Sequence, residues 1–248
     1  MDAYTGFAYV YDEYMDNIPY DEWAEYLISL LKEQGVPDDG AVADLGCGTG
    51  TVTRILDKTG YDCIGIDMSE DMLVIASEKM YESEQQIIYT EQDMRDFGLP
   101  YQVDACVSIG DSMNYITSRE DIKKVFSCVH DNLIDGGVFI FDLKTIHFFR
   151  DILKDNVYAQ NRDDSAFIWD NTYDEDSRNN IYDLAVFVRN EEGTFDRFEE
   201  NHYQHGFYDD EVTGAAAEAG LKLVAVYDAF GQEAPSDLSE RLYYIFKK

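Results

Sequence analysis

Three glycines at alternate positions follow an acid in residues 42–50, which read VADLGCGTG. An apolar run leads up to Asp44, and a stretch with helical spacing follows the last glycine, so the pattern predicts a strand, a tight turn and a helix. Glycine lets the backbone turn with φ > 0 and approach a ligand without a Cβ atom in the way. The free N–H groups of the turn and of the helix start can receive a polar or anionic group. The turn is therefore a candidate ligand site, and an ordinary strand-to-helix turn without ligand is the alternative.

The spacing distinguishes this turn from a dinucleotide-binding fingerprint. Such a fingerprint, starting at Gly46, requires a third glycine at position 51, where the chain has Thr51. The pattern is instead DxGxGxG, which resembles the first motif of the class I methyltransferases that use S-adenosylmethionine. The resemblance implies that Gly46, Gly48 and Gly50 form the turn that holds the methionyl part of the cofactor, and that Asp44 lies close to it.

A second acid ends the next apolar run. Asp67 follows the first glycine by about twenty residues, the spacing expected for a carboxylate at the tip of the adjacent strand, where it can accept both ribose hydroxyls. A solvated acid at a strand end is the alternative. The resemblance further implies that Asp93 accepts the adenine amino group, that the N–H of Met94 faces the ring, and that Met68 covers the other ring face. Taken alone, Asp93 would be an ordinary turn residue.

The exit of the fourth expected strand, residues 110–115, is the place where a parallel sheet puts its chemistry, outside the carboxyl ends of the strands. Asp111 and Tyr115 are the candidate catalytic residues there, either as a general base or, as the stronger alternative, as groups that orient the substrate. Methyltransferases that act on exocyclic amines of nucleobases resemble one another here in an Asn/Asp-Pro-Pro-aromatic run. This chain has no proline in that stretch, which counts against nucleobase substrates.

Residues 1–36 predict two helices, one within residues 3–16 and one that starts at Pro19. Packing against the sheet is one explanation for this segment. The other is a cap over the cofactor, because in similar small-molecule methyltransferases a tyrosine-bearing N-terminal segment closes over the methionyl end. Tyr11 and Tyr20 are the candidates for that contact.

From residue 41 onward, short apolar runs alternate with helical stretches, which is typical of a parallel sheet with helices on both faces. Residues 145–208 break this rhythm with expected strands joined by polar turns. We therefore expect an α/β fold with an antiparallel β-meander inserted after the fifth strand. The resemblance implies a Rossmann-like sheet of seven mostly parallel strands, the last one antiparallel. The expected parts are a helical cap over 1–36, a cofactor-binding core over 37–144 and 209–248, and the insert over 145–208. The insert is expected to serve as a lid, an acceptor-binding element or a dimer contact.

The chain is strongly acidic, with 19 basic and 51 acidic residues and a formal net charge of −32. Such a surface repels phosphate backbones and anionic membranes, so nucleic acid and membrane partners are disfavoured. The cysteines show no CxxC spacing, and His202 and His205 point to opposite faces of an expected strand, so no metal site is expected. No apolar leader and no run of membrane-spanning length is visible. We expect a cytoplasmic protein with reduced thiols, as a monomer or homodimer.

Together these features predict the transfer of a methyl group from S-adenosylmethionine to a small-molecule acceptor. Nitrogen or oxygen is the favoured nucleophile, and in-line displacement yields S-adenosylhomocysteine. The layout is most similar to the branch that methylates amino groups of sugars or small amines. The many acids fit a cationic acceptor, although a solvated acidic surface explains them as well. A protein-substrate methyltransferase, a non-catalytic S-adenosylmethionine-binding protein and an NAD-dependent oxidoreductase are the alternatives.

Overall fold

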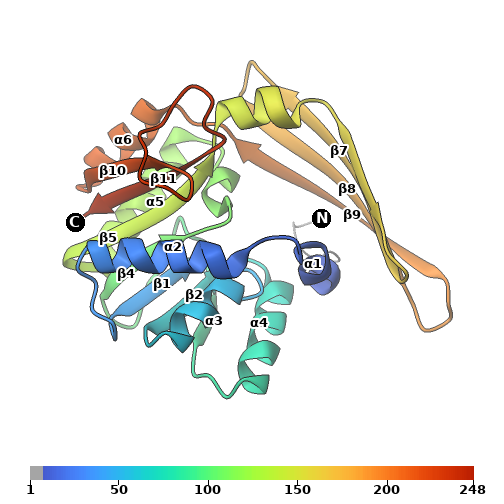
Figure 1. Ribbon diagram of the computed structural model, residues 1–248, viewed down its shortest axis with the longest axis horizontal. Helices are drawn as coiled ribbons and strands as arrows, with labels where there is room; N and C mark the ends of the chain where they lie inside the picture. The colour runs from blue at the N-terminus through green and yellow to red at the C-terminus, as the bar shows by residue number, and fades with distance from the viewer. Residues whose placement is uncertain (1–7) are drawn as a thin grey trace.

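A seven-stranded sheet forms the centre of the computed structural model, which describes residues 8–248 (Figure 1). The order of its strands is β10-β11-β5-β4-β1-β2-β3. The last strand in the sequence runs antiparallel to both of its neighbours, and the other pairs are parallel. The expected Rossmann-like α/β fold is confirmed. The strands are β1 (Ala41–Leu45), β2 (Asp62–Asp67), β3 (Ile88–Glu91), β4 (Val103–Ser108), β5 (Leu133–Lys144), β10 (Lys222–Asp228) and β11 (Arg241–Lys247).

Helices cover both faces of this sheet. They are α2 (Tyr20–Glu33), α3 (Thr51–Lys58), α4 (Glu70–Glu82), α5 (Arg119–Asn132) and α6 (Asp209–Glu218). Side chains alternate along each strand, so Val42 of β1 packs with α2 and α3 on one face, while Ala43 and Leu45 pack with α5 and α6 on the other. Burial on both faces explains why the strands read as continuous apolar runs in the sequence.

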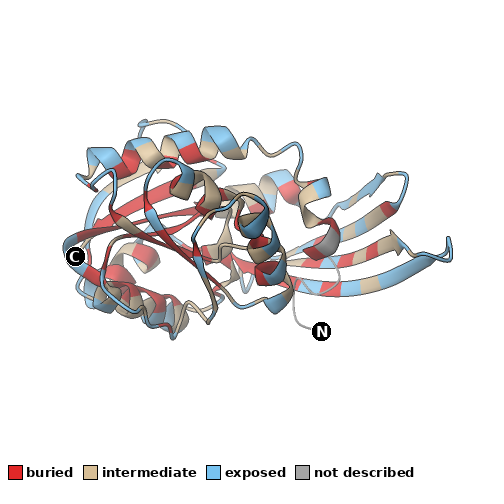
Figure 2. Ribbon diagram, turned by 90° about the horizontal axis from the view of Figure 1, so that it is seen from below, coloured by how far each residue is buried: buried red, intermediate tan, exposed pale blue. Residues whose placement is uncertain are grey.

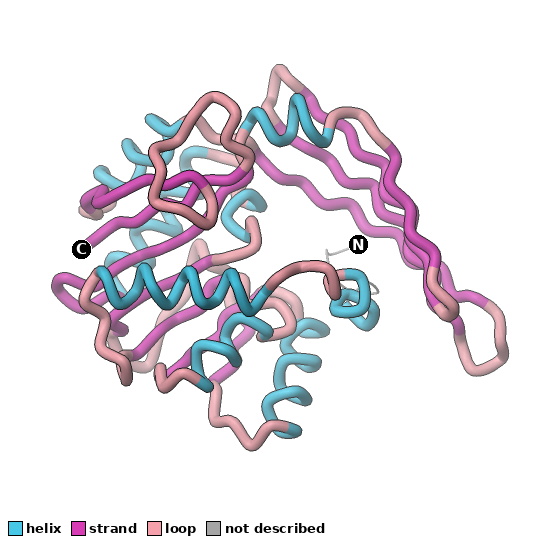
Figure 3. Tube along the Cα trace, viewed as in Figure 1, coloured by secondary structure: helices cyan, strands magenta, loops and turns pink. Residues whose placement is uncertain are grey.

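A second, antiparallel sheet follows β5 and extends away from the core (Figure 1, Figure 3). Its strands, in spatial order, are β6 (Val157–Asn161), β7 (Ser165–Asp174), β8 (Asn179–Arg189) and β9 (Phe195–His205), and the π-helical turn η2 (Phe148–Leu153) leads into them. The inserted meander is confirmed, with β6 as an additional strand. The sequence analysis missed β6 because this edge strand is mostly exposed and shows no alternation of apolar and polar side chains.

A short helix, α1 (Ala8–Tyr14), joins the core to the inserted sheet. Val10 packs against Leu184 of β8, and the Tyr14 hydroxyl donates a hydrogen bond to Ser165 Oγ at 2.7 Å. Burial is therefore concentrated in the core sheet and where the inserted sheet meets α1, whereas the outer end of the insert is largely exposed (Figure 2).

The N-terminal helices lie close to their expected positions. Residues 3–7 of the first expected helix lie outside the described residues. The second helix begins directly after Pro19, and Gly35, with φ of 85°, lies just beyond its end. Within residues 8–248, no helix combines the length and the apolar character that a membrane crossing requires.

Candidate active site

The three glycines that follow β1 all adopt left-handed backbone conformations, with φ of 73° at Gly46, 54° at Gly48 and 72° at Gly50. A Cβ atom on Gly46 would lie 2.6 Å from the Cβ of Ser112, and one on Gly50 would collide with the Tyr89 hydroxyl. At Gly48 a Cβ atom would meet nothing within 4 Å. Packing therefore requires the outer two glycines, while the middle one presents its backbone to open space, as close approach of a ligand demands.

Asp67 stands at the tip of β2, beside this turn. Its Oδ2 atom accepts the N–H of Gly48 at 2.8 Å, and its Oδ1 atom accepts the N–H of Ser69 at 2.9 Å. Burial raises the pKa of Asp67, and the hydrogen bonds from these two N–H groups oppose that effect. The carboxylate thus shapes the turn that it faces, and its contact with the ribose stays a prediction.

Asp44 is buried at the end of β1, with 3% of its surface exposed. The Thr53 hydroxyl of α3 donates a hydrogen bond of 2.6 Å to its Oδ2 atom. Burial raises the pKa of Asp44 to about 6, because Thr53 offsets only part of the desolvation and the negative charge of Asp67 adds to it. A cationic group bound at the turn would stabilise both carboxylates.

The residues expected around the adenine ring lie in different surroundings. The carboxylate of Asp93 is held by the Arg95 side chain, with Nε 2.9 Å from Oδ1 and Nη2 2.6 Å from Oδ2. Met94 is partly buried against the core beside Gly46, whereas Met68 is 59% exposed. The bidentate pair with Arg95 could not be foreseen from the motif, and an adenine amino group would have to share the Asp93 carboxylate with it.

The two candidate tyrosines of the N-terminal segment lie close together, because the Tyr11 side chain acts to lower the pKa of Tyr20. Burial raises the pKa of Tyr20, and the negative charges of Asp12 and Asp111 add to this effect. Tyr20 therefore lies within electrostatic reach of the exit of β4. This position brings the cap close to the expected chemistry, and its contact with the cofactor stays a prediction.

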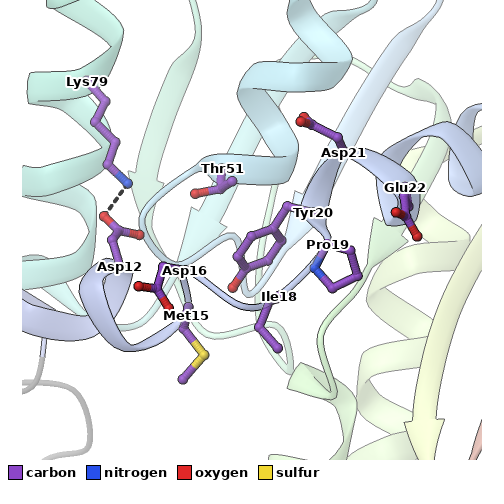
Figure 4. A pocket seen from close by; sticks show the side chains of 10 residues that line it. All are labelled: Asp12, Met15, Asp16, Ile18, Pro19, Tyr20, Asp21, Glu22, Thr51 and Lys79. Carbon is purple, nitrogen blue, oxygen red and sulfur yellow. Dashed lines mark ion pairs between the residues drawn. The ribbon is translucent and has the colours of Figure 1, made fainter. Parts of the chain in front are cut away.

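Asp12 of α1 is a residue that sequence reasoning missed. It accepts a hydrogen bond from the Thr49 hydroxyl of the glycine turn at 2.8 Å and forms an ion pair of 2.5 Å with Lys79 of α4 (Figure 4). One carboxylate thus links α1 to both the turn and α4, and we call these contacts of Asp12 with Thr49 and Lys79 the clasp. No spacing pattern marks Asp12 in the sequence, because its partners lie 37 and 67 positions further along the chain.

A hollow of about 530 Å³ opens beside this clasp (Figure 4). In Figure 4 the Tyr20 side chain lies between Thr51 and Ile18. None of residues 46–50 lines the hollow, so we do not assign the cofactor to it. Its lining consists of Asp12, Met15, Asp16, Ile18, Pro19, Tyr20, Asp21, Glu22, Thr51 and Lys79.

Asp111 lies at the centre of a buried polar cluster at the exit of β4. Its Oδ1 atom accepts from Arg241 Nη2 at 2.9 Å, and its Oδ2 atom accepts from Lys144 Nζ at 3.0 Å and Gln204 Nε2 at 2.7 Å. Arg241 also pairs with Asp142. Burial acts to raise the pKa of Asp111, but the two cations outweigh it and hold that pKa below its usual range. A carboxylate with a lowered pKa is a weak base, so these contacts favour the orienting role.

Tyr115, the second catalytic candidate, ends the 3₁₀ helix η1 (Ser112–Tyr115). Its hydroxyl lies 3.1 Å from Nδ1 of His202 on β9, and His202 Nε2 lies 3.1 Å from Oε2 of Glu200. His202 and Glu200 are both buried. The neighbouring His205 instead bonds Asn179 Oδ1 at 2.8 Å. The inserted sheet therefore contacts the exit of β4 through the side chains of β9.

A parallel sheet whose first strand leads into a glycine-rich turn and whose second strand ends in a half-buried acid defines an enzyme class that binds a nucleoside-bearing cofactor. Residues 42–137 match the family described as a methyltransferase domain. The chain is 35% identical over 246 residues to the "Putative methyltransferase YqeM" of Bacillus subtilis, covering 99% of this chain and 97% of that protein.

Two further comparisons agree. The crystal structure of an S-adenosylmethionine-dependent methyltransferase from Clostridium acetobutylicum matches with a TM-score of 0.87 and 26% identity over 99% of both chains. The dTDP-3-amino-3,4,6-trideoxy-α-D-glucopyranose N,N-dimethyltransferase of Streptomyces venezuelae is 30% identical over 115 residues, 46% of this chain and 47% of that one. The chain belongs to the S-adenosylmethionine-dependent methyltransferase family that includes YqeM. Because this family uses S-adenosylmethionine, the alternative of an NAD-dependent oxidoreductase is rejected.

The residues around the turn fit this cofactor. When bound, S-adenosylmethionine supplies a methyl group on a positively charged sulfur, and it also carries an ammonium group. Asp44 and Asp67, whose pKa values desolvation raises, carry negative charge that such a cation would offset. Gly48 leaves its backbone open to the ligand side.

The pKa of Asp44 predicts a pH dependence of cofactor binding. We expect the affinity for S-adenosylhomocysteine, which keeps the ammonium group, to weaken as the pH falls through about 6, because protonation removes the negative charge of Asp44. Stability responds in the opposite direction. The pKa of Asp44 is raised in the folded chain, so its protonated form adds stability that is lost as the pH rises through about 6.

Calorimetric titration across this pH range, with Asp44→Asn as the comparison, tests the assignment. The variant should show a flatter pH dependence of the dissociation constant, because only the contribution of Asp67 remains. Its asparagine can still accept the Thr53 hydrogen bond, so folding is preserved. An Asp44→Asn variant with the same pH dependence as the parent chain would show that Asp44 does not face the ammonium group.

The clasp formed by Asp12 predicts slower cofactor exchange in the parent chain than in Asp12→Asn. Asp12→Asn removes a partly exposed ion pair and the charge that strengthens the Thr49 hydrogen bond, which together are worth about 1 kcal/mol, so S-adenosylhomocysteine should dissociate roughly fivefold faster. Stopped-flow displacement measures the rate. Asp16→Asn is the matched control, because Asp16 pairs with Arg162 of the insert and not with the turn. Equal rates in both variants would rule out a clasp.

Proposed function

We propose that this methyltransferase acts on a small molecule and transfers the methyl group to an amine nitrogen, with a hydroxyl oxygen as the second choice. The observation that carries the proposal is the contact of the inserted sheet with the β4 exit. Gln204 of β9 contacts Asp111, and His202 contacts Tyr115, so both catalytic candidates face side chains of the insert. A site bordered by side chains of both the core and the insert suits a small acceptor better than a protein surface.

In this proposal the chain has three parts. They are a cap over residues 1–36, a core over 37–144 and 209–248, and an acceptor-binding insert over 145–208. Asp111 orients the acceptor through its bound cations, and Tyr115 faces the nucleophile. The residues that we propose to hold the cofactor are Tyr11, Tyr20, Asp44, Gly46, Gly48, Gly50, Asp67, Met68, Asp93 and Met94.

A hollow of about 500 Å³ beside the Asp111 cluster supports the proposal. Lys144 and Arg241 line it and also bind Asp111, and the rings of Phe148 and Phe230 add apolar surface. This volume lies within the range of small-molecule sites. The similarity to an enzyme named for an amino-sugar substrate also favours an amine.

The protein's share of the reaction is alignment in a site that excludes water. Displacement requires the nucleophile in line behind the methyl group at about 3 Å, with the acceptor nitrogen unprotonated. The buried cluster around Asp111 provides fixed hydrogen-bonding groups for this purpose, since each of its charges is paired.

A panel of amines, with mass-spectrometric detection of the methylated product and of S-adenosylhomocysteine, tests the proposal. The panel contains glycine, sarcosine and dTDP-3-amino-3,4,6-trideoxy-α-D-glucopyranose, together with their hydroxyl analogues. We expect at least one amine to be methylated, its hydroxyl analogue to react more slowly, and Asp111→Asn to react more slowly than the parent chain. Methylation of proteins alone, seen with labelled cofactor in a cell lysate, would overturn the proposal in favour of a protein substrate.

A further inference from the structure

The short helix η1 connects the glycine turn directly to the inserted sheet. At its first residue, the Ser112 hydroxyl donates a hydrogen bond of 3.2 Å to the Gly46 carbonyl. At its last residue, the Tyr115 hydroxyl meets His202 at 3.1 Å. A 3₁₀ helix rises about 2 Å per residue, so these two residues are only about 6 Å apart along its axis. Tyr115 therefore lies within a side-chain length of the turn that holds the cofactor.

Behind Tyr115 lies a buried pair of ionisable groups. The Glu200 side chain is 0% exposed, the His202 side chain is 4% exposed, and their facing atoms are 3.1 Å apart. Both residues project from the same face of β9, as does Gln204, which binds Asp111. Strand alternation thus aligns a carboxylate, an imidazole and an amide on the face of β9 that meets the exit of β4.

A purely structural cross-link does not need ionisable groups. The same sheet joins β7 to β8 with a neutral amide pair, in which Asn171 and Asn180 exchange hydrogen bonds of 3.0 and 2.7 Å. A buried carboxylate costs more free energy to desolvate than an amide, and it repays that cost only through a charged or strongly polar partner. The presence of Glu200 and His202 at the β4 exit therefore indicates a role in proton transfer and not in structure alone.

We propose that Tyr115, His202 and Glu200 form a proton relay that deprotonates the methyl acceptor; this inference rests on the proposed function. The resting relay has Nε2–H of His202 donating to Glu200 and the Nδ1 lone pair accepting the Tyr115 hydroxyl. An acceptor ammonium group passes a proton to the Tyr115 oxygen while the phenolic proton moves to His202 Nδ1. Glu200 stabilises the imidazolium that results.

This step needs no further reactant, because every proton and electron pair is accounted for. The N–H electron pair stays on the acceptor nitrogen, which then forms the N–C bond as the C–S bond breaks and its pair remains on sulfur. The proton held on His202 leaves to solvent after product release. Tyr115 is the group that touches the acceptor, and His202 and Glu200 act through it as positioning residues.

Glu200 is a charged partner that the His202 ring contacts on its own strand. Tyr115 of η1 contacts the other ring nitrogen, and Tyr182 of β8 is the cross-strand neighbour of His202. Burial raises the pKa of Tyr182 well above its ordinary value, so this tyrosine stays neutral. Its hydroxyl donates to Gln204, which connects this face of β9 to Asp111.

Nitrogen NMR of the protein saturated with S-adenosylhomocysteine tests the relay without an acceptor. In nitrogen-15-histidine-labelled protein, with His202→Asn identifying the signal, we expect the neutral imidazole to carry its proton on Nε2. In Glu200→Gln, a weaker amide acceptor replaces the carboxylate, so the tautomer with the proton on Nε2 should be less populated than in the parent chain. A proton on Nδ1, or an imidazolium that stays charged throughout the neutral range, would overturn the relay, because no lone pair would then accept the tyrosine proton.

The pH–rate profile provides the second test, with whichever amine of the panel above turns over. We expect Tyr115→Phe and His202→Asn to lower kcat by about 10²–10⁴-fold near neutral pH, the usual share of general-base catalysis. The rate should recover at high pH, where the amine arrives unprotonated, and S-adenosylhomocysteine binding should be unchanged. His205→Asn is the matched control, because His205 bonds Asn179 instead of η1.

The possible outcomes separate the two proposals. An acidic limb that stays at the same pH in Tyr115→Phe and His202→Asn would refute the relay while leaving amine methylation intact. Failure of every amine in the panel would refute the proposed acceptor, and the tautomer of His202 would still decide for or against the relay.

Discussion

Gly46→Ala should lower the free energy of unfolding by about 2–5 kcal/mol and abolish tight binding of S-adenosylhomocysteine. A left-handed conformation costs an alanine about 1–2 kcal/mol, and forcing an extra methyl group into a packed site costs about 1–3 kcal/mol more. Both apply here, because φ is 73° and the new Cβ atom would lie 2.6 Å from the Cβ of Ser112. Relief of this clash must displace η1, which carries Tyr115.

Two other glycines provide the controls for this experiment. Gly193, with φ of 80° and open space around it, lies in the turn between β8 and β9, so Gly193→Ala should show the backbone strain alone and normal cofactor binding. Gly48→Ala should also cost only the strain in stability, yet lose affinity, because its Cβ atom would project into the space left for the ligand. Chemical denaturation and calorimetric titration measure the two quantities. Equal effects of Gly46→Ala and Gly193→Ala on stability and binding would contradict the packing argument.

Asp67→Ala should raise the dissociation constant of S-adenosylhomocysteine by about 10–150-fold, equivalent to about 1.5–3 kcal/mol for charge-assisted hydrogen bonds left unmade. Two causes act together. The ribose hydroxyls would lose their acceptor, and the N–H groups of Gly48 and Ser69 would lose theirs, so the turn itself would be less ordered. Calorimetric titration gives the loss directly.

The control for Asp67 comes from the same strand. Asp62→Ala at the opposite end of β2 removes a carboxylate whose Oδ2 atom accepts the Tyr101 hydroxyl at 2.7 Å, far along the strand from the turn. We expect it to bind S-adenosylhomocysteine normally. An Asp67→Ala variant that folds and binds as tightly as Asp62→Ala would eliminate the ribose assignment.

The charges around Asp111 distinguish it from Tyr115, the other catalytic candidate. From the sequence, Asp111 and Tyr115 were equivalent, since both lie in the exit of the fourth strand. The structure surrounds Asp111 with Lys144 and Arg241, which keep it ionised, and places a buried histidine behind Tyr115. The difference arises from β5, β9 and β11, which approach the exit loop only in the folded chain.

Local patterns in the chain were sufficient to predict the strand–turn–helix unit, the acid at the tip of β2, the alternating core and the presence of an antiparallel insert. These features are local, because strand and helix periodicity and the φ values that only glycine adopts easily are expressed within a few residues of one another. The glycines of residues 46–50 are the clearest case, since the pattern alone predicted a turn that the structure places beside Asp67.

The partners of the site residues depend on contacts between distant parts of the chain. Asp12 meets Thr49 and Lys79, and Asp111 meets Arg241, across separations of 37, 67 and 130 positions. No spacing rule encodes such contacts, because they depend on how the helices and sheets pack and not on the period of any one element. The edge strand β6 also depends on a contact with another element, since its pairing with β7, rather than its own residues, makes it a strand. The glycine turn could therefore be read from the chain, whereas the relay behind Tyr115 required the fold that brings β9 to it.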